Sequence, residues 1–175
     1  MLLVLTILPV TYSKLQSIGN SNANVETAFY VLNAGYDNVD IHLDNLVPSN
    51  HVYTYNFSVS NNKDSKRADT DMEYFVKITT TTNLPLTYAL YLNQEYNDNG
   101  ATNIITNDVV EADEDGTYFK KMTTNNKTFL HSKDETNFYQ LTVVFPEEYT
   151  DIKYQGIIEG INISIDSKQK VKESQ

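Results

Sequence analysis

The stretches HVYTYNFSVS (residues 51–60) and DMEYFVKI (residues 71–78) decide the fold. Both alternate large apolar side chains with polar ones, and an alternation of period two is typical of a half-buried strand. The apolar face of the first stretch consists of Tyr53, Tyr55, Phe57 and Val59. That of the second consists of Met72, Tyr74, Val76 and Ile78. We expect the two stretches to be neighbouring strands of one sheet whose apolar faces share a core.

Strand signals recur along the rest of the chain, separated by polar turn residues. They cover residues 25–32, 39–43, 86–93, 136–145 and 154–165. Residues 61–71 carry charges of both signs and are expected to be a solvated loop. In residues 94–134 the pattern is weaker, and we expect loops with edge strands near 118–122 and 128–131. No helical period runs beyond two turns, so the sequence predicts an all-β, antiparallel β-sandwich of jelly-roll or Ig-like type with roughly seven to nine strands.

The composition fits one domain and excludes several classes of function. A chain of 175 residues can bury about 70% of the surface that its unfolded form exposes, so it needs no covalent staple. It has no cysteine, which rules out disulfides, thiolate metal sites and a cysteine nucleophile. Its 13 basic and 23 acidic residues give a net charge of -10. This charge argues against binding to nucleic acid or to an anionic membrane surface.

The first ten residues are apolar apart from Thr6, and they are too short to span a bilayer, which takes about 20 residues. We interpret them as the apolar core of a secretory signal peptide whose basic n-region is missing, with cleavage between Ser17 and Asn24. The alternative is a buried N-terminal strand. The expected layout is a signal-peptide remnant at 1–20, a single β-sandwich domain at 21–166 and a polar C-terminal tail at 167–175. The mature form is expected to have no stable membrane span.

No pattern of catalytic residues is present. His42, His51 and His131 lie far apart in the sequence, without the close spacing of two zinc ligands on one element, and we interpret them as surface residues. There is no Gly-x-Ser-x-Gly elbow and no glycine-rich phosphate loop. The sequence therefore predicts a protein that is not an enzyme and has no catalytic, cofactor-binding or metal-binding residues.

Two acidic stretches match only the first half of an EF-hand calcium loop. One runs from Glu111 to Gly116, and Met122 stands where the bidentate glutamate belongs. The other runs from Glu95 to Gly100 and fails in the same way at Thr106. A weak structural calcium site and a solvated acidic loop are both compatible with this pattern, and the solvated loop is favoured.

The order of features along the chain resembles that of a known family. An apolar leader runs into Thr11-Tyr12-Ser13-Lys14, and a strand at Val25 follows a small polar stretch. Leu46-Val47-Pro48-Ser49 then precedes an aromatic alternating strand that closes at Ser60-Asn61. In these features the chain is similar to the TasA and camelysin group, small secreted proteins of Gram-positive-type bacteria that are exported through a SipW-type signal peptidase. The likeness covers residues 1–78 and the isoleucine-rich strand near the C-terminus, and Ser49 stands where the group often has glycine.

The resemblance implies a jelly-roll or Ig-like sandwich that works outside the cell or at its surface, as a subunit of a filament or biofilm matrix. In that group, the segment after the cleavage site can act as a donor strand that completes the sheet of the next subunit, through main-chain hydrogen bonds at an open edge. Such a head-to-tail contact need not close, so it builds a filament. By position the donor here is residues 21–31, with the candidate assembly residues Ser21, Ala23, Val25, Thr27, Phe29 and Val31. The implied partners are copies of the same chain and, during export, the signal peptidase.

Two other functions remain open at this point. Camelysin has been regarded as a metalloprotease, but this chain has no recognisable zinc motif, which argues against that activity. The second is a solitary adhesive or ligand-binding sandwich that uses the loops of residues 94–134, because loops on a rigid scaffold often carry binding.

Overall fold

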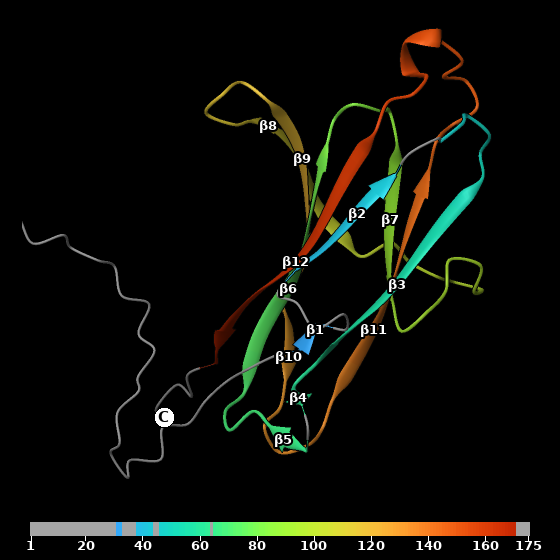
Figure 1. Ribbon diagram of the computed structural model, residues 1–175. Coiled ribbons are helices and arrows are strands. Elements are labelled where there is room, and N and C mark those ends of the chain that lie inside the picture. Colours follow the sequence, from blue (N-terminus) through green and yellow to red (C-terminus); the bar gives the residue numbers. More distant parts are fainter. Residues whose placement is uncertain (1–30, 33–37, 44–45, 64, 171–175) are drawn as a thin grey trace, which may run out of the picture.

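The computed structural model describes residues 31–32, 38–43, 46–63 and 65–170 (Figure 1). The candidate donor residues Ser21, Ala23, Val25, Thr27 and Phe29 lie outside these ranges, as do the leader and the expected cleavage region. The described strands are β1 (Val31–Leu32), β2 (Asn38–Leu43), β3 (Val52–Ser60), β4 (Asn62–Lys63), β5 (Lys66–Arg67), β6 (Met72–Thr81), β7 (Thr87–Leu92), β8 (Ile105–Ala112), β9 (Tyr118–Thr124), β10 (Lys127–Phe129), β11 (Thr136–Val144) and β12 (Glu159–Gln169). A 3-10 helix, η1 (Ile152–Tyr154), precedes β12.

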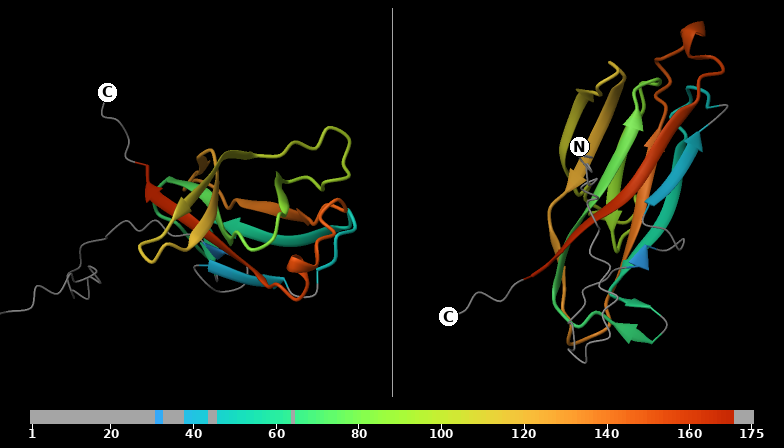
Figure 2. Two further views of the ribbon diagram at one scale, coloured as in Figure 1. Left: turned by 90° about the horizontal axis from the view of Figure 1, so that it is seen from above. Right: turned by 60° about the vertical axis from the view of Figure 1, so that its left-hand side comes forward.

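The strands form two antiparallel sheets that pack face to face (Figures 1 and 2). Sheet A has the order β1-β3-β11-β7, and sheet B has the order β2-β12-β6-β9-β8, with β10 also paired to β6. β4 and β5 form a separate hairpin. Among the described strands, nine are longer than two residues, and all recorded pairings are antiparallel. The predicted all-β, antiparallel sandwich is confirmed.

The core lies between the inner faces of the two sheets. Along β6, buried residues alternate with half-buried ones from Met72 to Thr81, as the sequence pattern predicts. The largest fully buried side chains come from both sheets: Tyr74, Tyr139, Phe129, Phe145, Met72, Ile78, Leu90, Met122, Leu141, Ile161 and Ile163. Each such side chain stabilises the fold by about 1.5–3 kcal/mol relative to an exposed position.

The two stretches that decide the fold do share this core, but they are not neighbours in one sheet as expected. β3 belongs to sheet A, where it pairs with β11, and β6 belongs to sheet B, where it pairs with β12. An alternating pattern shows which face of a strand is buried but not which strand lies beside it. Residues 61–71 carry the chain from one sheet to the other, so the apolar faces meet across the core.

The connection of residues 61–71 is also more ordered than the expected solvated loop. It contains the β4–β5 hairpin, whose turn includes Ser65 at a φ of 67°. Asn61 and Ala68, at the two ends of the hairpin, are buried, and the Ala68 N–H donates to the Asn61 carbonyl over 3.0 Å. Charged residues dominate the sequence of this segment, so its two buried residues, Asn61 and Ala68, could not be recognised from the sequence pattern.

The later strands differ from expectation in three places. β9 and β10 lie near the two weak strands that were predicted, but β8 was not predicted, because its residues are exposed on both faces and show no alternation. β12 begins at Glu159 rather than 154, since residues 152–154 form η1. It also continues to Gln169, so residues 167–169 belong to the last strand and not to a tail.

A polar network is buried where the two sheets meet. The Tyr74 and Tyr139 hydroxyls, one from each sheet, lie 2.9 Å apart. Asn137 Nδ2 donates to the Tyr74 hydroxyl over 2.6 Å, which leaves Tyr74 able to donate to Tyr139. Burial raises the pKa of both phenols. The network therefore links the sheets by a directional contact within the core.

Replacing Tyr139 with phenylalanine tests this network. The Tyr139→Phe variant keeps the stacking on Phe57, whose ring centroid lies 5.1 Å away, but leaves the Tyr74 hydroxyl without its acceptor. We expect the free energy of unfolding to fall by about 1–2 kcal/mol in urea denaturation. The exposed Tyr118 provides the control, and Tyr118→Phe should leave stability unchanged. Equal stability of the two variants would show that the bridge between the sheets contributes nothing.

Candidate functional site

The outer edges of β7 and β8, at one side of the sandwich, are protected against pairing with another strand. The Leu90 N–H of β7 donates to Asn103 Oδ1 over 3.0 Å, and its carbonyl accepts from the Ile104 N–H over 2.9 Å. β8 has an irregular register between Ile105 and Asn107. It also carries ion pairs from Asp108 and Glu111 to lysines of β9. Covered backbone groups, irregular register and charge are the usual means by which proteins block a sheet edge.

Among the described residues, in contrast, most of the outer edge of β3 has no strand partner. β1 pairs only with the last two residues of β3, through Val31 opposite Ser60 and Leu32 opposite Val59. Within the described ranges no strand pairs with residues 52–58 on this side. At about 3.3 Å per residue, these seven positions make an edge of about 23 Å.

The register shows which backbone groups point toward this edge. The Asn61 N–H donates to the Glu135 carbonyl, so the odd-numbered residues of β3 exchange hydrogen bonds with β11. On the other side of β11, the Asn93 N–H donates to the Phe138 carbonyl, which gives the same alternation. The outward N–H and carbonyl groups therefore belong to the even-numbered residues of the open stretch, which are Val52, Thr54, Asn56 and Ser58.

Among the candidate donor residues the structure places only Val31, in β1 at the closed end of the β3 edge. Because β1 runs antiparallel to β3, the direction from Leu32 to Val31 points past Ser60 and away from residues 52–58. By Asn38 the chain has crossed to sheet B, where this residue lies opposite Ser164.

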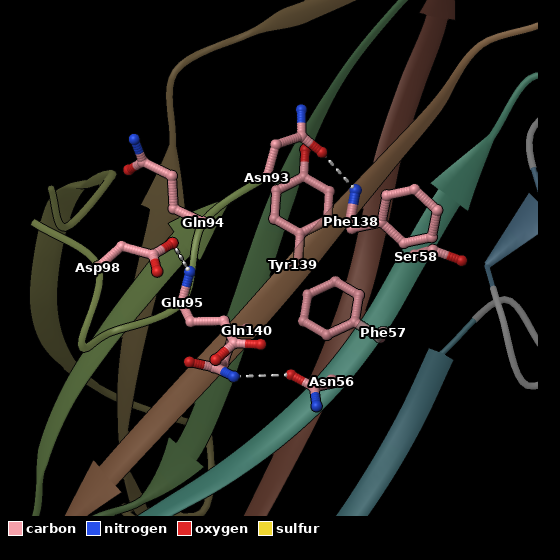
Figure 3. Close-up of a pocket in the computed structure, with 10 residues that line it drawn as sticks. All are labelled: Asn56, Phe57, Ser58, Asn93, Gln94, Glu95, Asp98, Phe138, Tyr139 and Gln140. Carbon is pink, nitrogen blue, oxygen red and sulfur yellow. Dashed lines mark hydrogen bonds between the residues drawn. The ribbon is translucent and has the colours of Figure 1, made fainter. Parts of the chain in front are cut away.

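A groove of about 540 Å³ lies on the outer face of sheet A, beside the connection that follows β7 (Figure 3). Gln140 Nε2 donates to Asn56 Oδ1, and Gln140 Oε1 accepts from the Tyr96 N–H. Asn93 Oδ1 accepts from the Phe138 N–H. These amides hold the connection against the sheet, so they are already occupied. Phe138 is 63% exposed, although phenylalanines are usually buried.

A second, more apolar pocket of about 650 Å³ lies at the end of the sandwich where η1 is found. We call this end the η1 pole, and its lining includes Leu46, Val47, Pro48, Tyr149, Ile152 and Tyr154. Val47 is 60% exposed and Ile152 is 82% exposed. The sequence analysis missed this site, although apolar residues inside segments rich in turn residues could have indicated it. Contiguous exposed apolar side chains mark interaction surfaces.

The acidic and histidine residues form no metal site in the described part of the chain, where no group of three or more His, Cys, Asp or Glu side chains comes together. Instead, residues 113–116 form the turn of the β8–β9 hairpin. Asp115 accepts from the Thr117 N–H over 2.9 Å, and this bond lowers the pKa of Asp115. His131 Nδ1 lies 2.6 Å from Asp71 Oδ1 at a partly exposed position.

One carboxyl group is fully buried, at the start of β12. Glu159 is 0% exposed, and its Oε2 accepts the N–H groups of Asn83 (3.0 Å) and Leu84 (2.9 Å). Burial raises the pKa of Glu159, although the two backbone hydrogen bonds act in the opposite direction. The side chain fixes the turn between β6 and β7 against sheet B, which is a structural role.

The Glu159→Gln variant should change how stability depends on pH. Because the folded state holds the proton more tightly than the unfolded state, this group stabilises the wild type below its ordinary pKa of 4.5, and that contribution is lost as pH rises through the folded pKa. Glutamine keeps the acceptor and does not titrate. We expect the melting temperature of the variant, relative to that of the wild type, to increase as the pH rises from about 4 to about 7, roughly the range in which a carboxyl group with a raised pKa loses its proton. A difference between the two melting temperatures that stays the same at every pH would contradict this expectation.

Comparison with known proteins gives no match: no family model, no curated protein and no solved structure is similar to this chain. The resemblance to the TasA and camelysin group therefore stays a hypothesis. In the described ranges, no helix is long and apolar enough to cross a membrane. What the described part of the chain defines is an antiparallel β-sandwich in which most of the outer edge of β3 has no strand partner and one end is apolar.

Proposed function

We propose that this protein is a secreted or cell-surface structural subunit of a Gram-positive-type bacterium, not an enzyme, that assembles with copies of itself into a filament or biofilm matrix. The observation that supports this most is the open edge of β3 together with the direction of β1. The edge lacks a strand partner in the described chain, and β1 is oriented with its N-terminal end away from this edge. A second copy is then the natural acceptor for the segment before Val31.

Backbone hydrogen bonding supplies the affinity of such a contact. The four even-numbered residues between 52 and 58 offer N–H and carbonyl groups that an added strand would pair. Each hydrogen bond contributes about 0.5–1.5 kcal/mol. Several together can hold two copies, and the same contact repeated from copy to copy extends without closing.

The experiment is to compare two forms of the protein, one beginning at Ser21 and one beginning at Val31. Electron microscopy and size-exclusion chromatography should show filaments only for the longer form. A synthetic peptide of residues 21–31 should bind the shorter form, and a scrambled peptide of the same composition should not. The proposal is wrong if both forms stay monomeric at every concentration and the peptide does not bind.

The groove beside β7 supports a second candidate function, an adhesive or ligand-binding sandwich. Its favouring observation is the exposed Phe138 ring next to amide and carboxylate side chains, since an exposed ring offers a stacking surface for the apolar face of a sugar. A glycan array tests it. The Phe138→Ala variant should lose binding and Tyr118→Ala, also on an exposed aromatic residue, should not. No hit on the array counts against this function.

A further inference from the structure

The two ends of the sandwich differ in chemistry. The η1 pole exposes apolar side chains, and beside them Glu147 and Glu148 are exposed and form no ion pair with any described residue. The opposite end, which we call the hairpin pole, consists of the β4–β5 hairpin and the turn of residues 130–135 (Figure 1). It presents the exposed Leu130 and the exposed Lys66, which forms no ion pair with a described residue.

Other charges at the hairpin pole are already matched within the chain. Arg67 pairs with Asp134 over 3.3 Å, and Lys133 pairs with Glu135 over 3.0 Å. At the η1 pole, Lys153 pairs with Asp151 over 3.4 Å. Among the described residues, the η1 pole therefore has two carboxylates without an ion-pair partner beside its apolar pocket, and the hairpin pole has one such ammonium group, that of Lys66, together with the exposed Leu130.

The direction of β1 determines which poles can meet. A donor strand that lies on β3 with the polarity of β1 has its C-terminal end at Val52, next to residues 46–48 of the η1 pole. The body of the donating copy then lies beyond that pole. In that copy the donor segment leaves at Ser60, beside the β4–β5 hairpin. The hairpin pole of the donor thus faces the η1 pole of the acceptor.

The length of the segment is compatible with this contact. Seven of the ten residues in 21–30 cover the open stretch 52–58, which leaves about three residues, or about 10 Å, to connect the two bodies. A linker this short brings the two poles close together.

We propose that the η1 pole is the surface on which the hairpin pole of the next copy sits, with Leu130 of the donating copy against the pocket lined by Val47 and Ile152. This rests on the proposed function, because donor-strand exchange sets the orientation. The contact buries apolar side chains that one copy alone leaves exposed, and it brings Lys66 toward Glu147 and Glu148. Copies therefore stack in one orientation along the axis of β3.

Cross-linking tests the contact directly, because the chain has no cysteine of its own. Two variants of the form that begins at Ser21, Ile152→Cys and Leu130→Cys, each change an exposed residue. We expect a short bismaleimide to join the two variants when they are mixed under assembly conditions, and to leave each variant alone uncross-linked. A double variant should give a ladder of covalent oligomers. Cross-linking of Ile152→Cys alone at the same rate, or filaments without a 152–130 product, would overturn the proposal.

A second variant separates this inference from the proposed function. Ile152→Asp places a charge at the η1 pole without touching β3, so we expect at least a tenfold loss in filament yield while the peptide of residues 21–31 still binds. Val110→Asp on β8 is the control, since it also replaces an exposed β-branched residue but does not line the pocket of the η1 pole, and it should assemble normally. If Ile152→Asp forms normal filaments, the contact between the poles is wrong, but donor-strand exchange is not contradicted. If the peptide does not bind and the form that begins at Ser21 makes no filaments, both the pole contact and the proposed function are wrong.

Discussion

The Thr54→Pro variant is expected to stay folded and to lose assembly. The Thr54 N–H belongs to the even-numbered set that points to the open edge, so proline removes a donor that β11 does not use. Proline is tolerated on an edge strand when its nitrogen faces outward. We expect the free energy of unfolding of the monomer to change by less than about 1 kcal/mol. An added strand, in contrast, loses a hydrogen bond and meets the pyrrolidine ring, and about 1.4 kcal/mol already corresponds to a tenfold loss in affinity.

The position next to it supplies the control. Tyr55 lies in the odd-numbered set, so Tyr55→Pro removes a hydrogen bond to β11 and should cost about 3 kcal/mol or more in stability. Thr54→Val keeps the N–H and should assemble as the wild type does. Circular dichroism melts and size-exclusion chromatography measure both effects. If Thr54→Pro forms filaments at the same protein concentration as the wild type, the outer edge of β3 is not the acceptor of the donor strand.

The Asn61→Ala variant is expected to cause the largest loss of stability at a polar position. Asn61 is 0% exposed, and its Nδ2 donates to the carbonyls of Leu130 and Lys133, both over 3.0 Å. Its Oδ1 accepts the Glu135 N–H over 2.9 Å. Alanine leaves three backbone groups without partners, so we expect the free energy of unfolding to fall by about 3 kcal/mol, at about 1 kcal/mol for each hydrogen bond.

The neighbouring asparagine gives a matched control for this substitution. The Asn62 side chain forms no hydrogen bond to a described residue, so Asn62→Ala should change stability by less than about 0.5 kcal/mol. Urea denaturation measures both. Loss of Asn61 should also loosen the β4–β5 hairpin and the adjoining end of β3, which hydrogen exchange at the Ala68 amide would detect. Equal stability of the two variants would contradict the role given to Asn61.

Much of the fold could be predicted because burial leaves a simple record in the sequence. β3, β6, β7 and β11 each have one apolar face, and their bounds agree with the expected ones to within a few residues. β8 could not be predicted because its stability comes from pairing with β9 and not from burial. The assignment of β3 and β6 to one sheet was wrong because alternation does not identify strand neighbours.

The candidate site was only partly predictable for related reasons. The sequence suggests a donor segment by position, but an open acceptor edge is a property of pairing, and no residue type marks it. The burial of Glu159 could not be predicted either, because a glutamate in a strand pattern is normally taken as exposed. Here two backbone N–H groups of a turn donate to its buried carboxyl group. Val47 and Ile152 carry a sequence signal, since both are apolar residues in turn segments, and they could have been found.

The direction of β1 at Ser60 has a consequence for growth. In an assembly joined by donor exchange, the two ends are chemically different: one displays a bare β3 edge and the other a free N-terminal segment. A copy that begins at Val31 can accept that free segment but has none to pass on. Small amounts of it would act as a chain terminator at one end alone, leaving addition at the opposite end to continue.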